Sequence, residues 1–300
     1  VTPTNFNTLT INRLSGTTNW GNNPITLSGD LEVIVGTGIF AINNASGNID
    51  VGGDININTG ELRVSQSSTN VVTGNVNING ILGITNTNGI IEVSGNITGA
   101  GVQSLSSTGR LVMVGTGKTL ASTVTYDNVE INSLGNISLT GSTTFTGVIT
   151  LTSGNLVVGN NTLSLNYNGT PIARTSGFIS MSATSNLEIG DGTQTSTTTI
   201  PNNTFVTPTN FNTLTINRLS GTTNWGNNPI TLSGNANIDA GSGYFILNNV
   251  TGTMAVGGNL NINSGEFRVS VGSNNTVTGN LNIVGTLGLT AATAYITVSG

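Results

Sequence analysis

The chain has 300 residues, of which only 6% are charged and 5% are aromatic, and it contains neither cysteine nor histidine. Seven basic and twelve acidic residues give a net charge of −5, so no basic surface for nucleic acid or anionic lipid is expected. The lack of cysteine excludes disulfides and thiol chemistry, and no run approaches the roughly 20 apolar residues of a membrane helix.

A long repeat organises the sequence. Residues 1–29 recur without a change at 206–234, which gives a 205-residue period. Beyond the identical block the copies diverge but stay aligned, because GELRVS at 60–65 corresponds to GEFRVS at 265–270. Such a period, made of short strand-like segments, indicates a modular array. We therefore expect residues 1–205 to form one complete module and residues 206–300 the first part of the next, in a window of a longer array.

The segments between glycines read as short strands. TLTIN at 8–12, DININ at 54–58 and TLSLN at 162–166 alternate apolar and polar residues with the period of two that marks a half-buried strand. No segment shows an apolar face of helical period. Gly, Asn and Asp between the strands are expected to supply corners with positive φ.

A shorter period lies inside the module. Gly53, Gly74 and Gly95 are evenly spaced, and the second copy keeps this spacing from residue 258 to residue 300. Two or three strands per unit, each unable to bury its apolar side alone, predict an all-β fold. The expected architecture is a β-solenoid with coils of about 19–24 residues and essentially no helix. An array of β-sandwich modules is the alternative, but sandwich strands need not share the even phase of these glycines.

The solenoid makes specific predictions about stacking. Ile55 should stack on Val76 and Ile97, and Leu260 on Leu281, in continuous apolar columns. The polar residues beside the first column, which are Asp54, Asn75 and Asn96, should form a ladder from coil to coil. Stacked strands rise about 4.8 Å per coil, so one module would add about 47 Å.

Few residues could carry catalysis. Without histidine, the commonest general base and metal ligand is missing. Asp50 and Asp54 are the closest aspartate pair, but Ala255 and Asn259 replace them in the second copy. We therefore predict no enzymatic activity, no metal site and no cofactor.

Two further segments suggest ligands only superficially. The segment 188–192, EIGDG, resembles part of a calcium loop but lacks the nine-residue repetition of such loops, so a corner turn is the favoured interpretation. The Thr-rich run at 194–199 would suit ice binding only if it recurred on successive coils. It occurs once, which favours a linker strand or a corner.

Two sets of residues hold the same places in both copies and are candidate chain–chain contacts. Glu61 and Arg63, with Glu266 and Arg268, lie two residues apart on a strand. A solvated ion pair, worth well under 1 kcal/mol, is the favoured interpretation, and a contact between chains is the alternative.

The second set lies in the identical block. Arg13 and Trp20 correspond to Arg218 and Trp225, and these are the two tryptophans of the chain. The indoles would serve as a structural plug against the loop at 22–24, as a chain–chain contact or as a sugar-stacking platform. The first two roles are favoured over carbohydrate binding. The identity of the block indicates either a surface with many partners or a recent duplication.

The phrases at 149–166, at 7–16 and at 279–290 resemble the repeat regions of giant cell-surface proteins of Bacteroidota that the type IX secretion system exports. These include gliding adhesins and the extracellular, grappling-hook-like filaments of predatory relatives. Filamentous haemagglutinin-like adhesins carry similar phrases. The resemblance implies an extracellular location on the bacterial surface and a structural role without enzymatic activity.

The function expected from the sequence is therefore a shaft segment of a long extracellular filament or adhesin. Its expected partners are other copies of the same chain in a homo-oligomeric fibre, without nucleic acid and without membrane insertion in this segment. The alternative is a glycan-binding adhesin module that recognises the surface glycans of another cell through Trp20, Trp225 and neighbouring asparagines.

Overall fold

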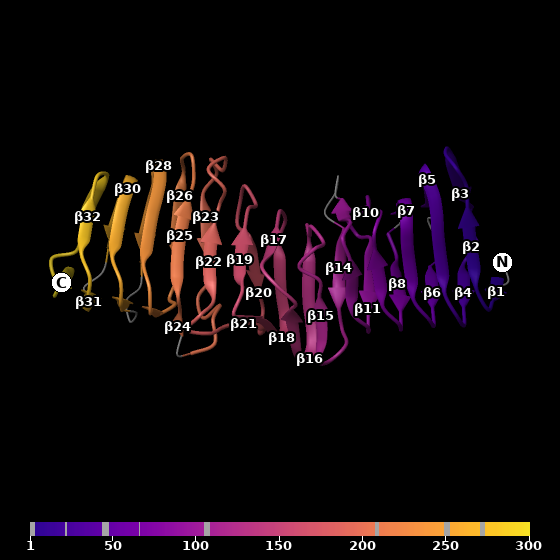
Figure 1. Cartoon of the computed structure of the whole chain (residues 1–300), viewed down its shortest axis with the longest axis horizontal. Helices are drawn as coiled ribbons and strands as arrows, with labels where there is room; N and C mark the ends of the chain where they lie inside the picture. Colours follow the sequence, from indigo (N-terminus) through magenta and orange to yellow (C-terminus); the bar gives the residue numbers. More distant parts are fainter. Residues whose placement is uncertain are drawn as a thin grey trace. The chain divides into compact units, whose positions relative to one another are not determined.

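The fold is a β-solenoid. A computed structural model describes residues 4–21, 23–43, 48–65, 67–104, 109–207, 210–248, 253–270 and 274–300. These residues form short strands and turns and contain no helix, and the paired strands run parallel to one another (Figure 1). The all-β solenoid predicted from the period-two segments is thus confirmed. Among the described residues, no helix is long and apolar enough to cross a bilayer.

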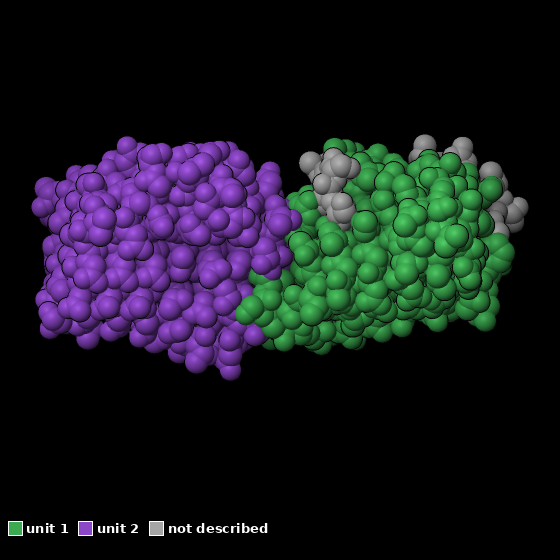
Figure 2. All heavy atoms as spheres, turned by 45° about the horizontal axis from the view of Figure 1, so that its top comes forward, with its two compact units in different colours: residues 1–143, 152–154 green, residues 144–151, 155–300 purple. Residues whose placement is uncertain are grey.

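The chain packs as two compact units (Figure 2). Unit 1 comprises residues 1–143 and 152–154, and unit 2 comprises residues 144–151 and 155–300. The division therefore falls near residue 150, whereas the sequence repeat begins again at residue 206. Packing density and sequence repetition are separate properties, so the units do not test the predicted modules.

The strands of unit 1 lie in three columns, and within a column each strand pairs with its equivalent in the next coil. One column runs β1–β4–β6–β8–β11–β14–β16, a second β2–β5–β7–β9–β12–β15–β16 and a third β3–β5–β7–β10–β13. The long strands β5, β7 and β16 bend around a corner and so belong to two columns. The strands of this unit are β1 (Thr4–Phe6), β2 (Leu9–Asn12), β3 (Thr17–Trp20), β4 (Ile25–Leu27), β5 (Leu31–Ile42), β6 (Ile49–Val51), β7 (Ile55–Val64), β8 (Thr69–Val72), β9 (Val76–Ile78), β10 (Ile81–Ile84), β11 (Ile90–Val93), β12 (Ile97–Gly99), β13 (Val102–Ser104), β14 (Arg110–Met113), β15 (Lys118–Leu120) and β16 (Val129–Leu139).

Unit 2 is built in the same way. Its columns include β19–β22–β25–β28–β30–β32, β23–β26–β28–β30–β33 and β24–β27–β29–β31–β34, and β18 pairs with β20 and β21. The remaining strands of the chain are β17 (Thr143–Phe145), β18 (Ile149–Gly159), β19 (Thr162–Leu165), β20 (Ile172–Arg174), β21 (Phe178–Met181), β22 (Asn186–Ile189), β23 (Thr198–Ile200), β24 (Asn210–Phe211), β25 (Thr213–Asn217), β26 (Thr222–Trp225), β27 (Ile230–Leu232), β28 (Ala236–Leu247), β29 (Met254–Val256), β30 (Leu260–Val269), β31 (Asn274–Val277), β32 (Leu281–Ile283), β33 (Thr286–Leu289) and β34 (Tyr295–Val298).

The predicted apolar stacking is confirmed. Ile55 is in register with Val76, which is in register with Ile97, and all three are buried. In unit 2, Leu260 is in register with Leu281. Because alternate residues of each strand point inward, every coil adds one layer of aliphatic side chains to the same interior columns.

The predicted polar ladder is also confirmed, and its hydrogen bonds show how it works. The Oδ1 of Asp54 accepts the backbone N–H of Asn75 at 2.7 Å, and the Oδ1 of Asn75 accepts the backbone N–H of Asn96 at 2.9 Å. Asn96 in turn accepts the N–H of Thr119 at 3.0 Å. Each side chain thus satisfies a corner N–H of the next coil, which a strand ladder would otherwise leave without an acceptor.

The glycines that mark the shorter period have a different role from the predicted one. Gly53, Gly74 and Gly95 do not have positive φ. They are required because the coils approach closely at this corner: a Cβ placed on Gly95 would collide with the carbonyl oxygen of Gly74. Positive φ occurs at other glycines, and among the described residues Asn203 is the one non-glycine residue in that region.

Coil length varies more than the sequence suggests. A short coil brings Leu111 into register with Val129, whereas a coil half as long again brings Leu187 into register with Leu214. The longer coil contains the segment 190–197, which lies between β22 and β23 and belongs to no strand. Gln194 fixes this segment, because its Nε2 donates to the Asn166 carbonyl at 2.9 Å and its Oε1 accepts the Asp191 N–H at 2.8 Å.

Candidate functional site

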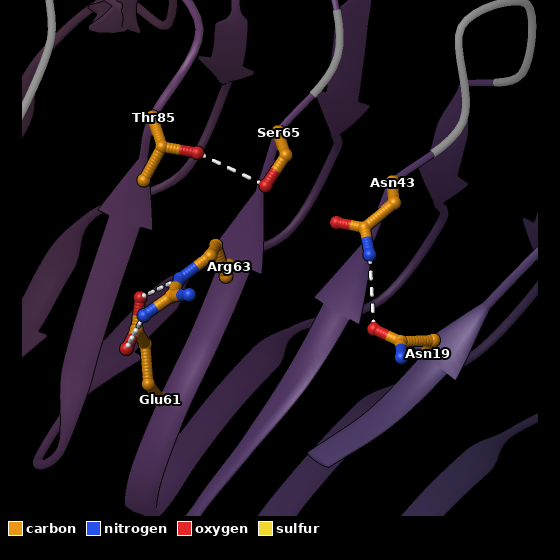
Figure 3. Close-up of polar contacts among 6 residues, drawn as sticks. All are labelled: Asn19, Asn43, Glu61, Arg63, Ser65 and Thr85. Atoms are coloured by element: carbon orange, nitrogen blue, oxygen red, sulfur yellow. Dashed lines mark hydrogen bonds and ion pairs between the residues drawn. The ribbon is translucent and has the colours of Figure 1, made fainter.

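The best-defined repeated surface feature is an ion pair with a glycine beside it, and Figure 3 shows the pair in unit 1. Glu61 and Arg63 of β7 form a two-pronged pair, with Nε–Oε1 and Nη2–Oε2 distances of 2.6 and 2.7 Å. The next strand, β10, places Gly83 in register with Arg63. A Cβ on Gly83 would lie 2.5 Å from the Glu61 Oε1, so glycine leaves the room into which the carboxylate leans.

The same arrangement recurs in unit 2. Glu266 and Arg268 pair at 2.8 and 3.0 Å, and Gly288 lies in register with Arg268. A Cβ on Gly288 would again meet the carboxylate. Here the Arg268 guanidinium also lies 4.5 Å above the ring of Tyr244. The sequence predicted that each Glu and Arg share a face and can pair, but it gave no role to either glycine.

These ion pairs are electrostatically modest. The hydrogen bond from Arg268 lowers the pKa of the Glu266 carboxyl, and the bond to Glu61 raises the pKa of the Arg63 guanidinium. Both pairs lie at the surface, where solvent screens the charges and little stability is gained. Their value is therefore geometric: each fixes a charged pattern at the same place in two copies.

Side chains around the first pair connect neighbouring coils along the same face (Figure 3). Asn43 donates from Nδ2 to the Oδ1 of Asn19 at 2.9 Å, and Thr85 donates from Oγ1 to the Oγ of Ser65 at 2.9 Å. The equivalents in unit 2 include a longer bond of 3.4 Å from Asn248 to Asn224. Hydroxyl and amide side chains on this face thus form hydrogen bonds between neighbouring coils.

Arg13 directly follows β2 of unit 1, and Trp20 is the last residue of β3. The Arg13 side chain is exposed and donates from Nη1 to the Thr17 carbonyl at 3.2 Å and to the Thr18 hydroxyl at 2.9 Å. Trp20 is half-buried, and its Nε1 donates to the Asn23 carbonyl at 3.0 Å.

Their counterparts in unit 2 lie inside the solenoid. Trp225 is fully buried: its ring stacks on Phe205 at 5.4 Å and meets Phe245 edge-on at 6.1 Å. Its Nε1 donates to the Asn228 carbonyl at 2.8 Å, so the predicted plug against this loop describes Trp225 well. A fully buried indole offers no platform for a sugar and no contact for another chain in the described structure.

Arg218 is buried as well and is therefore not a surface contact. Its Nη1 donates to the Thr198 hydroxyl at 2.6 Å, its Nη2 donates to the Ser196 carbonyl, and burial lowers the pKa of its guanidinium. Residues of the preceding coil cover Arg218, because Ser196 and Thr198 accept its hydrogen bonds. The comparison of the two copies assumed that equivalent residues have the same surroundings. The exposed Arg13 and the buried Arg218 do not.

One exposed residue of the identical block was missed. Leu14 is 87% exposed and its counterpart Leu219 is 57% exposed, at the corner that follows β2 and β25. A leucine standing out of the surface at the same place in both copies is an apolar feature with the period of the module. The signal in the sequence was its position, since Leu14 follows Arg13 outside the alternating pattern of the strand.

Three of the acidic residues make hydrogen bonds or ion pairs that support the fold. Asp54 belongs to the polar ladder, and the Oδ2 of Asp50 accepts from the Asn48 amide at 2.8 Å. Glu130 is buried, pairs with Arg110 at 2.5 Å between neighbouring coils and accepts from the Thr152 hydroxyl at 2.7 Å. Within the described part of the chain, no three Asp, Glu, His or Cys side chains come together as a metal site.

The chain matches no known protein-family model, and neither a curated protein nor a solved structure is significantly similar to it. Its function is therefore inferred from its own residues and geometry.

Proposed function

We propose that this chain is a non-enzymatic structural protein, a shaft segment of a long extracellular filament or adhesin in which several copies associate side by side. The observation that carries the proposal is the recurrence of the same outward features, one module length apart, on a β-solenoid. These features are the corner leucines Leu14 and Leu219 and the two Glu–Arg–Gly clusters, which are Glu61, Arg63 and Gly83 in unit 1 and Glu266, Arg268 and Gly288 in unit 2.

The fold suits a load-bearing element. Parallel strand pairing places backbone hydrogen bonds between successive coils, and the Asp54, Asn75 and Asn96 ladder adds side-chain bonds in the same direction. Each coil contacts chiefly its neighbours, so length grows by adding modules without redesigning a core. The composition, rich in Asn, Thr and Gly, and the resemblance to exported Bacteroidota repeat proteins support an extracellular location.

Association of copies would use the repeated features. Burying a well-exposed leucine against a partner contributes about 1.5–3 kcal/mol, which alone gives only a weak contact. Repetition in every module multiplies such contacts, because once one is made the others form at high effective concentration. The ion pairs would set the register between chains at little cost in desolvation.

Electron cryo-microscopy of the native assembly tests the proposal. A fibre several chains thick, with an axial repeat of about 47 Å or a simple multiple of it, is the expected result. In solution, the purified 300-residue chain should self-associate at high concentration, and the double variant Leu14→Ser with Leu219→Ser should weaken this association.

The matched control is Leu134→Ser, which removes a leucine that is 99% exposed but lies outside the identical block. It should associate as the wild type does. A native fibre one chain thick, together with a chain that stays monomeric at high concentration, contradicts the proposal.

A further inference from the structure

One hollow in unit 2 combines a positive charge with aromatic, aliphatic and amide side chains. It measures about 530 Å³, and part of its lining comes from β18, β20 and β21, the strands labelled in Figure 1. This volume is within the range of small-ligand sites, which is about 300–1,000 Å³. It is lined by Asn155, Arg174, Phe178, Asn203, Phe205, Val206 and Thr207.

Arg174 supplies a positive charge held in one orientation. Its Nε donates to the Gly177 carbonyl at 2.7 Å, and its guanidinium carbon lies 4.6 Å above the centre of the Phe178 ring. Neither terminal nitrogen has an acceptor among the described residues, so two parallel N–H donors remain available. A planar guanidinium fixed in this way matches the two oxygens of a carboxylate.

The other described cations of unit 2 are already neutralised or enclosed. Arg268 pairs with Glu266, and Arg218 is buried against Thr198 and Ser196. No carboxylate lines the hollow around Arg174. In a chain of net charge −5, this is therefore a local positive site without an internal counter-ion.

Another part of the lining, residues 203–207, is a fixed segment with both apolar and amide groups. Asn203 has a φ of 54°, and the segment is anchored by the N–H of Thr204 on the Asn228 Oδ1 at 2.7 Å and by the N–H of Val206 on the Ile179 carbonyl at 3.0 Å. The side chain of Asn203 is exposed and makes no hydrogen bond with another described residue, and Val206 is 39% exposed. Because this wall is formed in advance, a ligand need not order it on binding.

We propose that this hollow, with Arg174 as its anchor, binds a carboxylated sugar residue of an acidic polysaccharide. The guanidinium would take the carboxylate, Phe178 and Val206 would contact the C–H face of the ring, and the Asn203 amide would bond its hydroxyls. An acidic peptide shares the carboxylate but not the adjacent hydroxyls, so it fits the amide-bearing wall less well. The site does not depend on the shaft proposal, since it needs only one chain.

Calorimetric titration of the 300-residue chain tests the site with three probes: trigalacturonate, a hyaluronan tetrasaccharide and the α-methyl glycoside of N-acetylneuraminic acid. At least one should bind, and its methyl ester, which has the same ring without the charge, should bind at least tenfold more weakly. Arg174→Gln should weaken binding at least tenfold, whereas Lys118→Gln, which removes one positive charge in unit 1, should not change it.

A second variant guards against misfolding of the first. Val206→Glu changes an exposed residue at the mouth of the hollow and should repel an acidic ligand while leaving the circular dichroism spectrum unchanged. Absence of binding for all three probes at 10 mM, equal binding of acid and ester, unchanged affinity in Arg174→Gln, or tighter binding of an acetylated triglutamate peptide overturns the proposal.

Discussion

Asn70 is a fully buried amide that connects three coils of unit 1, and its removal gives the sharpest test of how the solenoid is held together. Its Oδ1 accepts the backbone N–H of Ile49 in the preceding coil at 3.0 Å. Its Nδ2 donates to the carbonyl of Ile90 in the following coil at 2.8 Å and to that of Ser68 at 3.2 Å.

The substitution Asn70→Ala removes all three bonds and leaves the Ile49 N–H without this acceptor. A buried donor left unsatisfied costs about 1–3 kcal/mol, and the lost amide leaves a small cavity in addition. We expect the free energy of unfolding of unit 1 to fall by about 2–4 kcal/mol. For a unit of this size, that corresponds to a fall in Tm of roughly 5–15 °C.

Two measurements on the full chain check the expectation. Urea unfolding followed by circular dichroism gives the free energy, and hydrogen exchange read by mass spectrometry locates the change. Amide exchange should accelerate at 49–51 and 90–93, by roughly 10- to 100-fold at Ile49 if local opening is eased by about 2 kcal/mol. Asn275→Ala should act alike in unit 2, because the Asn275 Oδ1 accepts the Met254 N–H at 3.0 Å.

Asn88→Ala is the matched control, since Asn88 is exposed on the loop before β11 and its side chain makes no hydrogen bond with a described residue. This control should change the free energy by less than about 0.5 kcal/mol. If Asn70→Ala were as mild as the control, or if exchange at Ile49 stayed slow, the buried amide would not be a connection between coils.

Three further predictions concern packing, corners and pH. Trp225→Leu removes the contacts with Phe205 and Phe245 and should lower the free energy of unfolding of unit 2 by about 2–4 kcal/mol. Trp20 is only half-buried, so Trp20→Leu should cost less, and thermal melts of the two variants measure the difference. Gly95→Ala should destabilise the fold more than Gly83→Ala. The new Cβ at residue 95 meets the fixed Gly74 carbonyl, whereas at residue 83 it meets the movable Glu61 carboxylate and should cost less than about 1 kcal/mol. Urea midpoints that rank the two variants the other way would contradict this. Burial raises the pKa of the Asp127 carboxyl from 3.8 to about 6, so the folded state favours the protonated carboxyl. The stability gained from this protonation is fully present below about pH 4 and is lost as the pH rises through 6. Between pH 4 and pH 7.5 the free energy of unfolding of the wild type should therefore fall relative to that of Asp127→Asn. The fall is at most about 3 kcal/mol, and about 1 kcal/mol once solvent screening of this half-buried group is included. A rise over that range would refute the assignment.

Much of the interior could be predicted because it is periodic. The alternation at 54–58 and the even spacing of the corner glycines were enough to place Ile55 on Val76 and Ile97, and to place Asp54 and Asn75 in one ladder. These relations follow from two regular periods, of which one fixes the face and the other fixes the neighbour.

The misses have local physical causes. Trp225 and Arg218 are enclosed with the help of the preceding coil, and the residues of the identical block carry no information about that coil. The ion pair between Arg110 and Glu130 joins two neighbouring coils at a place that the second copy in this sequence does not reach, so comparison of the copies could not reveal it. Asn70 did leave a signal, since it is in phase with the buried Val72, as its equivalent Asn275 is with Val277.

Coil-to-coil stacking also has a mechanical consequence. A coil of about 21 residues contributes only about 4.8 Å of height while folded, yet roughly 70 Å of chain once it is pulled out. Each coil is held mainly by its two neighbours, so a pulled end should release one coil at a time and not the whole unit at once. Each coil that unfolds under force therefore lengthens many-fold. A filament built of such units would lengthen in small steps under a sudden load and would refold when the tension falls.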